Sequence, residues 1–120
     1  MRRLRAEHRF SLSQGAVLGR LDREGPRSAS ELAAGERVRQ QSMAQTVGEL
    51  AAQGLIDRRP DPTDRRRVLL ELTGQGRRTL QADRQQREGW LARAITEGLS
   101  VDEQRTVAEA VPLLARLADL

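Results

Sequence analysis

The sequence of 120 residues predicts a mainly α-helical fold with a small β-hairpin and further helices at its C-terminal end. Its only aromatic residues are Phe10 and Trp90, so the core must consist of Leu, Val and Ala, which suits packed helices better than a β-sandwich. Three Ser residues are each followed three positions later by Gln or Glu, the pattern of a capping box at a helix start. Two short apolar runs flank a loop rich in Pro and Arg, which is typical of a β-hairpin.

The first two predicted helices are short and capped. Ser11 and Gln14 form a capping box, and Gly25 with Pro26 ends the helix that it begins. A second capping box begins at Ser28 and starts the next helix. We expect three apolar side chains of this second helix to face the core: Leu32, Ala33 and Val38.

The third helix is predicted to begin near Gln40, with one apolar and one polar face. Apolar residues recur at steps of three and four and form the buried face: Met43, Val47, Leu50 and Ala51. The opposite face carries Gln41, Gln45 and Glu49, and the residues near the first turn are Arg39, Gln40, Ser42 and Thr46. Among these, Gln and Arg suit base edges, and Ser and Thr suit phosphates. An ordinary surface helix has the same two faces, so this helix alone leaves both interpretations open.

The residues after Gly54 predict a β-hairpin with a charged tip. Its strands, 56–59 and 68–72, are too short to be stable without helices behind them. Prolines at alternate positions stiffen the loop, which carries three consecutive arginines: Arg65, Arg66 and Arg67. These repel one another unless an anion shares the site, and Asp64 can pair with only one of them, for which we expect Arg66. A solvated run of charges is the alternative interpretation. Helix, helix and hairpin in this order are the layout of a winged helix-turn-helix.

The C-terminal third predicts two helices that need a partner. Segment 73–99 is polar in its first half and apolar in its second, and a third capping box at Ser100 begins the last helix. A second subunit is the natural source of cover for its apolar face, and a closed helical hairpin within one chain is the alternative. The candidate dimerisation residues are Trp90, Leu91, Val107, Val111, Leu114 and Leu117.

Composition excludes several kinds of chemistry. The chain has no cysteine, which excludes disulfides, thiolate metal sites and thiol redox sensing. Its one histidine, His8, supports neither a metal site nor a Ser–His–Asp triad. No phosphate-binding loop is present, so we predict no catalytic residue, no metal and no cofactor, and therefore not an enzyme.

Charge and hydropathy indicate the partner and the compartment. The net charge is +4, and all 21 basic side chains are Arg, which grips phosphate and enters narrow minor grooves better than Lys. No apolar run approaches the roughly 20 residues of a membrane span, and no signal-type segment follows the basic start. We expect a cytoplasmic protein with double-stranded DNA as partner and no membrane association.

Many of these positions together resemble the multiple-antibiotic-resistance regulator (MarR) family of transcription factors, over about residues 10 to 118. The matching residues are Leu32, Ala33, 38–42, Val47, Leu50, 54–56, Arg58, Asp61, Pro62, Asp64, Arg66, Leu72, Thr73 and Gly76. The resemblance implies a homodimeric winged-helix repressor on a pseudopalindromic operator, with a possible small-molecule effector. It also implies that helix 40–53 reads the major groove, while Arg66 enters the minor groove and Asp64 holds it.

The resemblance also divides the chain. Residues 1–10 are expected to be a short remnant of a first dimerisation helix, since family members have some twenty residues before the position of Phe10. Residues 11–73 would form the DNA-binding domain and 74–120 the dimerisation region. Specificity is expected from Gln40, Gln41, Gln45, Thr46 and Arg66, and phosphate contacts from Arg39, Arg65 and Arg67. A winged-helix module that binds another protein is the alternative function, and a metal-responsive repressor is a third.

Overall fold

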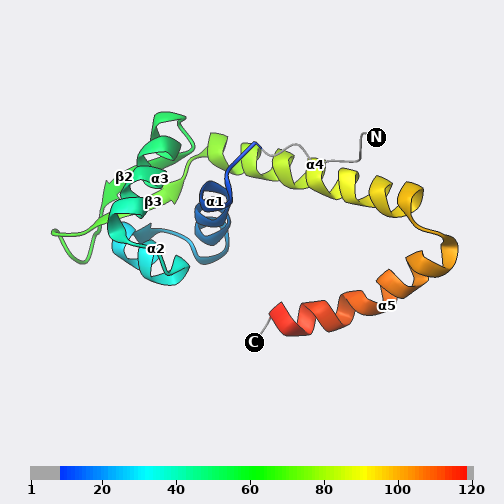
Figure 1. The fold of residues 1–120 in the computed structure, drawn as a ribbon. Helices are drawn as coiled ribbons and strands as arrows, with labels where there is room; N and C mark the ends of the chain where they lie inside the picture. Colours follow the sequence, from blue (N-terminus) through cyan, green and yellow to red (C-terminus); the bar gives the residue numbers. More distant parts are fainter. Residues whose placement is uncertain (1–8, 119–120) are drawn as a thin grey trace. The chain divides into compact units, whose positions relative to one another are not determined.

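The computed structural model describes residues 9–118 (Figure 1). These form two compact units: a winged-helix unit that ends at Arg84 and a C-terminal unit that begins at Gln85. Most of the predicted N-terminal remnant, residues 1–8, lies outside the described residues.

The winged-helix unit contains three helices, a three-stranded antiparallel sheet and the first turns of a fourth helix. The strand order is β1-β3-β2. Strands β2 and β3 and the loop between them form the wing, and in Figure 1 this loop extends away from the helices. The elements are α1 (Leu12–Glu24), β1 (Arg27–Ser28), α2 (Ala29–Glu36), α3 (Gln40–Ala52), β2 (Ile56–Pro60), β3 (Val68–Leu72) and α4 (Gly74–Gly98).

The helix starts and the hairpin are confirmed. The Ser11 hydroxyl accepts the N–H of Gln14 at 3.1 Å, and the Gln14 side chain accepts the N–H of Ser11 at 3.2 Å. The same reciprocal pair joins Ser28 to Glu31 at the start of α2. Gly25, with φ at +82°, ends α1. Strand β1 was not predicted; it pairs Ser28 with Leu69 of β3, so the capping residue of α2 is also part of the sheet.

The core of the winged-helix unit consists of Phe10, Leu55 and apolar side chains from all three helices, both wing strands and α4. Leu18, Leu32, Leu50 and Leu55 are fully buried. The expectation that Val38 faces the core is wrong: α2 ends at Glu36, so Val38 lies in the turn before α3 and is 42% exposed.

A close contact joins α4 to the end of α3. The Thr73 hydroxyl donates to the carbonyl of Gly54 at 2.7 Å and accepts the N–H of Gly76 at 2.8 Å, which caps α4. A Cβ at Gly76 would lie 2.0 Å from the carbonyl oxygen of Leu55. Only glycine fits there, which explains the Leu-Thr-x-x-Gly pattern of the sequence.

The C-terminal unit contains the rest of α4 and α5 (Val101–Ala118), whose start at Ser100 has the third predicted capping box. No residue of α5 is buried within the chain. Within residues 9–118 no helix is long and apolar enough to cross a membrane.

Candidate nucleic-acid interface

Helix α3 presents the polar face that the sequence predicted. Met43, Val47 and Leu50 are buried and fix the rotation of the helix. The opposite face and the first turn are exposed, and they carry five of the predicted DNA-contacting residues: Arg39, Gln40, Gln41, Ser42 and Gln45. Their amide, hydroxyl and guanidinium groups are the donors and acceptors that base edges and phosphates require.

Thr46 does not lie on this face. It is 9% exposed, and its hydroxyl donates to the carbonyl of Ser42 one turn earlier, at 3.2 Å. The structure therefore directs Thr46 between α3 and α1 rather than toward a partner in solution.

The turn before α3 holds two exposed arginines. Arg37 ends α2 in the left-handed conformation, with φ at 58° and ψ at 44°, which is unfavourable for a residue with a Cβ. Arg39 precedes α3 in extended conformation and makes no side-chain cap. Within the described part of the chain neither guanidinium has an ion pair, so both are available to an anionic partner.

At the tip of the wing, Asp64 contacts both the backbone and the side chain of Arg66. One carboxylate oxygen of Asp64, Oδ1, accepts the backbone N–H of Arg66 at 3.0 Å and lies 3.7 Å from its Nε. The predicted pairing of these two residues is confirmed. The side chain of Arg66 remains 94% exposed, and Arg65 beside it is exposed as well.

Arg67 points the other way, back toward the helices. Its Nη2 lies 2.8 Å from Oε1 of Glu31 on α2, and its Nε lies 3.3 Å from Oδ2 of Asp61. Its backbone also closes the loop, because its carbonyl accepts the N–H of Asp61 and its N–H donates to the carbonyl of Asp64. The three consecutive arginines thus have two different environments.

Asp61 and Glu31 were not predicted as parts of the site. Asp61 is buried, and its Oδ1 accepts the N–H and the hydroxyl of Thr63 at 2.9 and 2.8 Å. These hydrogen bonds and the nearby Arg67 lower the pKa of Asp61. The N–H of Ser28 and the charge of Arg67 likewise lower the pKa of Glu31. An Asp two residues before Thr is a turn pattern that could have indicated the role of Asp61, whereas no local pattern marks the pairing of Glu31 with Arg67.

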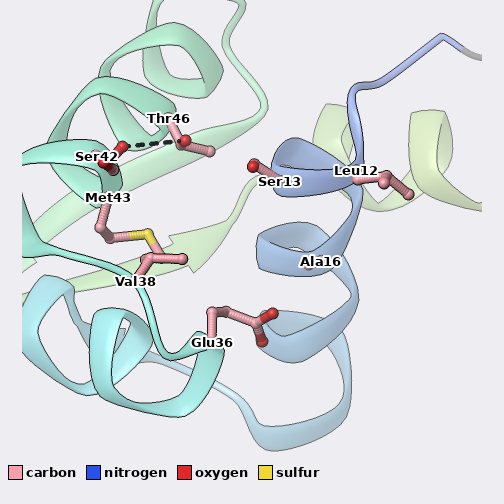
Figure 2. A pocket seen from close by; sticks show the side chains of 8 residues that line it. All are labelled: Leu12, Ser13, Ala16, Glu36, Val38, Ser42, Met43 and Thr46. Carbon is pink, nitrogen blue, oxygen red and sulfur yellow. Dashed lines mark hydrogen bonds between the residues drawn. The ribbon is translucent and has the colours of Figure 1, made fainter.

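A mostly apolar pocket of about 370 Å³ lies between α1, the turn after α2, and α3 (Figure 2). Glu36, which lines the pocket, is paired with Arg20, whose Nε lies 2.6 Å from its Oε2 and whose Nη1 lies 2.9 Å from Oε2 of Glu24. The pocket is lined by Leu12, Ser13, Ala16, Glu36, Val38, Ser42, Met43 and Thr46. Since three of these belong to α3, an occupant would contact the helix that carries the exposed polar face.

The six candidate dimerisation residues lie on α4 and α5. Trp90 is half-buried, and five form exposed apolar surface: Leu91, Val107, Val111, Leu114 and Leu117. Among residues 9–118 no group of three or more His, Cys, Asp or Glu side chains could hold a metal ion.

Comparisons with known proteins agree with this geometry. A family model described as MarR family matches residues 10–67. An HTH-type transcriptional regulator of Mycobacterium tuberculosis is 37% identical over 109 residues, which cover 91% of this chain and 76% of the relative. A solved Pseudomonas aeruginosa protein described as a candidate transcriptional regulator is 44% identical, with a TM-score of 0.77 over 90% of this chain and 75% of its own. The apo form of E. coli MarR, at 24% identity, shares the fold with a TM-score of 0.72 over 88% of this chain and 78% of its own.

Proposed function

Since the chain belongs to the MarR family of winged helix-turn-helix, DNA-binding transcriptional regulators, we propose that it is a repressor that binds a pseudopalindromic operator as a homodimer. The main support for this proposal is that the winged-helix unit exposes two surfaces that suit DNA, the wing tip at Arg66 and the polar face of α3. Arg66 is held in place by Asp64 yet remains 94% exposed, and the polar face of α3 is exposed beside its buried anchor residues.

In this proposal the two surfaces bind different grooves of the DNA. Helix α3 enters the major groove, where Gln40, Gln41 and Gln45 contact base edges. Arg39, Ser42 and Arg65 contact phosphates and supply affinity that falls as salt rises. Arg66, held by Asp64, enters the neighbouring minor groove and senses its width.

The C-terminal unit joins two copies. In this proposal the exposed apolar side chains of α5, together with Trp90 and Leu91 of α4, pack against their counterparts in a second chain. Two α3 helices then lie in successive major grooves, about 34 Å apart, which explains why the operator must be pseudopalindromic.

The repressor is proposed to respond to a small effector bound in the pocket between α1 and α3. The lining is mostly apolar, and its one carboxylate is already paired with Arg20, so the effector should be a small and largely apolar molecule. Ala16→Phe would place a ring in the pocket and imitate the occupant. Weaker DNA binding by this variant is expected, and unchanged binding would rule the pocket out.

The DNA-binding proposal is tested by fluorescence anisotropy of the full chain on the DNA that flanks its own gene. We expect a preference over scrambled DNA of about a thousandfold, and a steep loss of affinity between two salt concentrations. Arg66→Ala should weaken binding strongly while leaving the dimer and the melting temperature nearly unchanged. Weak binding that is equal on both DNAs would contradict the proposal and favour a winged-helix module that binds another protein.

A further inference from the structure

We propose that Arg67 is a positioning residue, which fixes the wing against α2 so that Arg66 and α3 are presented to the DNA in one geometry. The sequence predicts phosphate contacts from both Arg65 and Arg67, whereas in the structure Arg65 is exposed and Arg67 pairs with Glu31 and Asp61. The inference rests on the proposed DNA-binding function and deepens it, because it assigns one of the three wing arginines to the protein rather than to the DNA.

Arg67 connects the wing loop with a helix. Within the described residues, the hydrogen bonds and ion pairs of loop residues 61–67 stay inside the hairpin, except for the pair between Arg67 and Glu31. Strands β2 and β3 have five residues each, and hairpins of this length are only marginally stable alone. A side chain that joins the base of the loop to α2 therefore restricts how far the tip can swing.

The anchor at the other end is rigid. Oε1 of Glu31 accepts both the N–H of Ser28, at 2.9 Å, and Nη2 of Arg67, at 2.8 Å. Glu31 is followed by the fully buried Leu32, and Ser28 pairs with Leu69 of β3. The cap of α2, the sheet and the wing loop thus meet at one carboxylate, on a helix that packs against α3.

The charges around Arg67 argue against a phosphate contact. Its guanidinium faces two carboxylates, those of Glu31 and Asp61, whose negative charge repels a phosphate. A cation that is already paired within the protein also displaces no counterion from DNA, so it adds nothing to the salt dependence of binding. Arg65 is exposed and has no such partner in the described part of the chain, which makes it the matched control.

The first experiment removes a negative charge and tests whether operator affinity falls, although the loss of an acidic group alone would raise it. Glu31→Gln keeps the capping box, because Gln at this position also bonds back to the cap, but it removes the charge that holds Arg67. Removing an acidic group from a DNA-binding surface ordinarily strengthens binding to any DNA. We expect the opposite on the operator, a loss of at least about threefold, with unchanged or stronger binding to scrambled DNA. Stronger binding to both DNAs would overturn the proposal.

The second experiment compares two neighbouring arginines. Arg65→Ala should lower the slope of log K against log salt by about 1 and keep the preference for the operator. Arg67→Ala should leave the slope unchanged and reduce the preference for the operator. A slope that falls by about 1 in Arg67→Ala would identify Arg67 as a phosphate contact and refute the positioning role.

A readout without DNA separates this inference from the proposed function. In Glu31→Gln, ¹⁵N relaxation should show larger amplitude motion at the amides of loop residues 61–67, with α1 unchanged. The melting temperature should change little, because exposed ion pairs contribute little to stability. If the wild-type chain shows no operator preference, the proposed function fails while the relaxation result still decides the role of Arg67. Unchanged motion of the loop amides in Glu31→Gln would refute the positioning role of Arg67.

Discussion

The two units of this chain differ in where their apolar side chains lie. In the winged-helix unit the apolar residues between Phe10 and Leu80 form a buried core. In the C-terminal unit, α5 has no buried residue, and Leu114 and Leu117 are more than half exposed. One unit is held together by its own core, whereas an exposed apolar helix face of this kind marks a surface for association. The same type of substitution should therefore have different consequences in the two units.

The largest effect is expected at Gly76, where α4 meets the winged-helix core. Gly76→Ala places a Cβ 2.0 Å from the carbonyl oxygen of Leu55, and because that atom is backbone, α4 must shift. We expect a loss of roughly 3 kcal/mol or more in the free energy of unfolding, measured by chemical denaturation.

Gly89 is the matched control on the same helix. A Cβ there meets nothing within 4 Å, so Gly89→Ala should raise stability by roughly 0.5 to 1 kcal/mol through its helix propensity alone. If both substitutions changed the free energy of unfolding equally, α4 would not be packed more tightly at Gly76 than at Gly89.

A smaller but still large effect is expected on association. Leu114→Arg in α5 puts a charge on the apolar face and should raise the dimer dissociation constant at least about a hundredfold, or about 2.7 kcal/mol. The melting transition of the winged-helix core should be unaffected by this change when measured on monomers. Sedimentation velocity over a concentration series measures the dimer dissociation constant of the wild type and the variant.

Leu12 is the control for that experiment, because it is 93% exposed but lies in the winged-helix unit. Leu12→Arg should leave the dimer intact. A wild-type chain that is monomeric, or a dimer that Leu114→Arg leaves intact, would remove α5 from the interface.

The helix starts and the hairpin could be predicted from the sequence because each depends on residues close together in the chain. A capping box spans four positions, and the wing needs two β-prone runs around a Pro-rich loop. The helical phase also indicates the burial of Thr46, because Thr46 lies three residues after Met43 and next to Val47, both on the buried side of α3. Its burial was therefore predictable in principle.

Other features depend on the folded chain. Strand β1 has two residues and exists only because β3 lies beside it. Val38 is exposed because Arg37 turns the chain left-handed, and no residue type marked that turn. Arg67 and Glu31 are 36 positions apart, so the sequence could not distinguish the role of Arg67 from that of Arg65.

The third prediction uses the strained turn of the winged-helix unit. Arg37 is the one non-glycine residue with positive φ among those described. A left-handed residue with a Cβ costs about 1 to 2 kcal/mol, while glycine adds roughly 0.5 to 1 kcal/mol of entropy to the unfolded chain. Arg37→Gly should therefore raise the free energy of unfolding by roughly 0.5 kcal/mol. Arg23→Gly, in the last turn of α1, should lower it by roughly 1 kcal/mol, and a loss in both variants would show that the turn is not strained.

The smallest effect is expected from pH, and it should be confined to the winged-helix unit. Asp61 has a pKa lowered from its ordinary value of 3.8, chiefly by the N–H and hydroxyl of Thr63 and then by Arg67. A lowered carboxyl pKa means that the folded state favours the ionised form, so its contribution is complete above about pH 5 and is lost as pH falls through the folded value. Asp61→Asn should therefore be less stable than wild type at pH 7, and the two should converge toward pH 2. Thermal unfolding of both chains at several pH values measures this, and a constant difference across the range would show that the charge of Asp61 does not hold the wing.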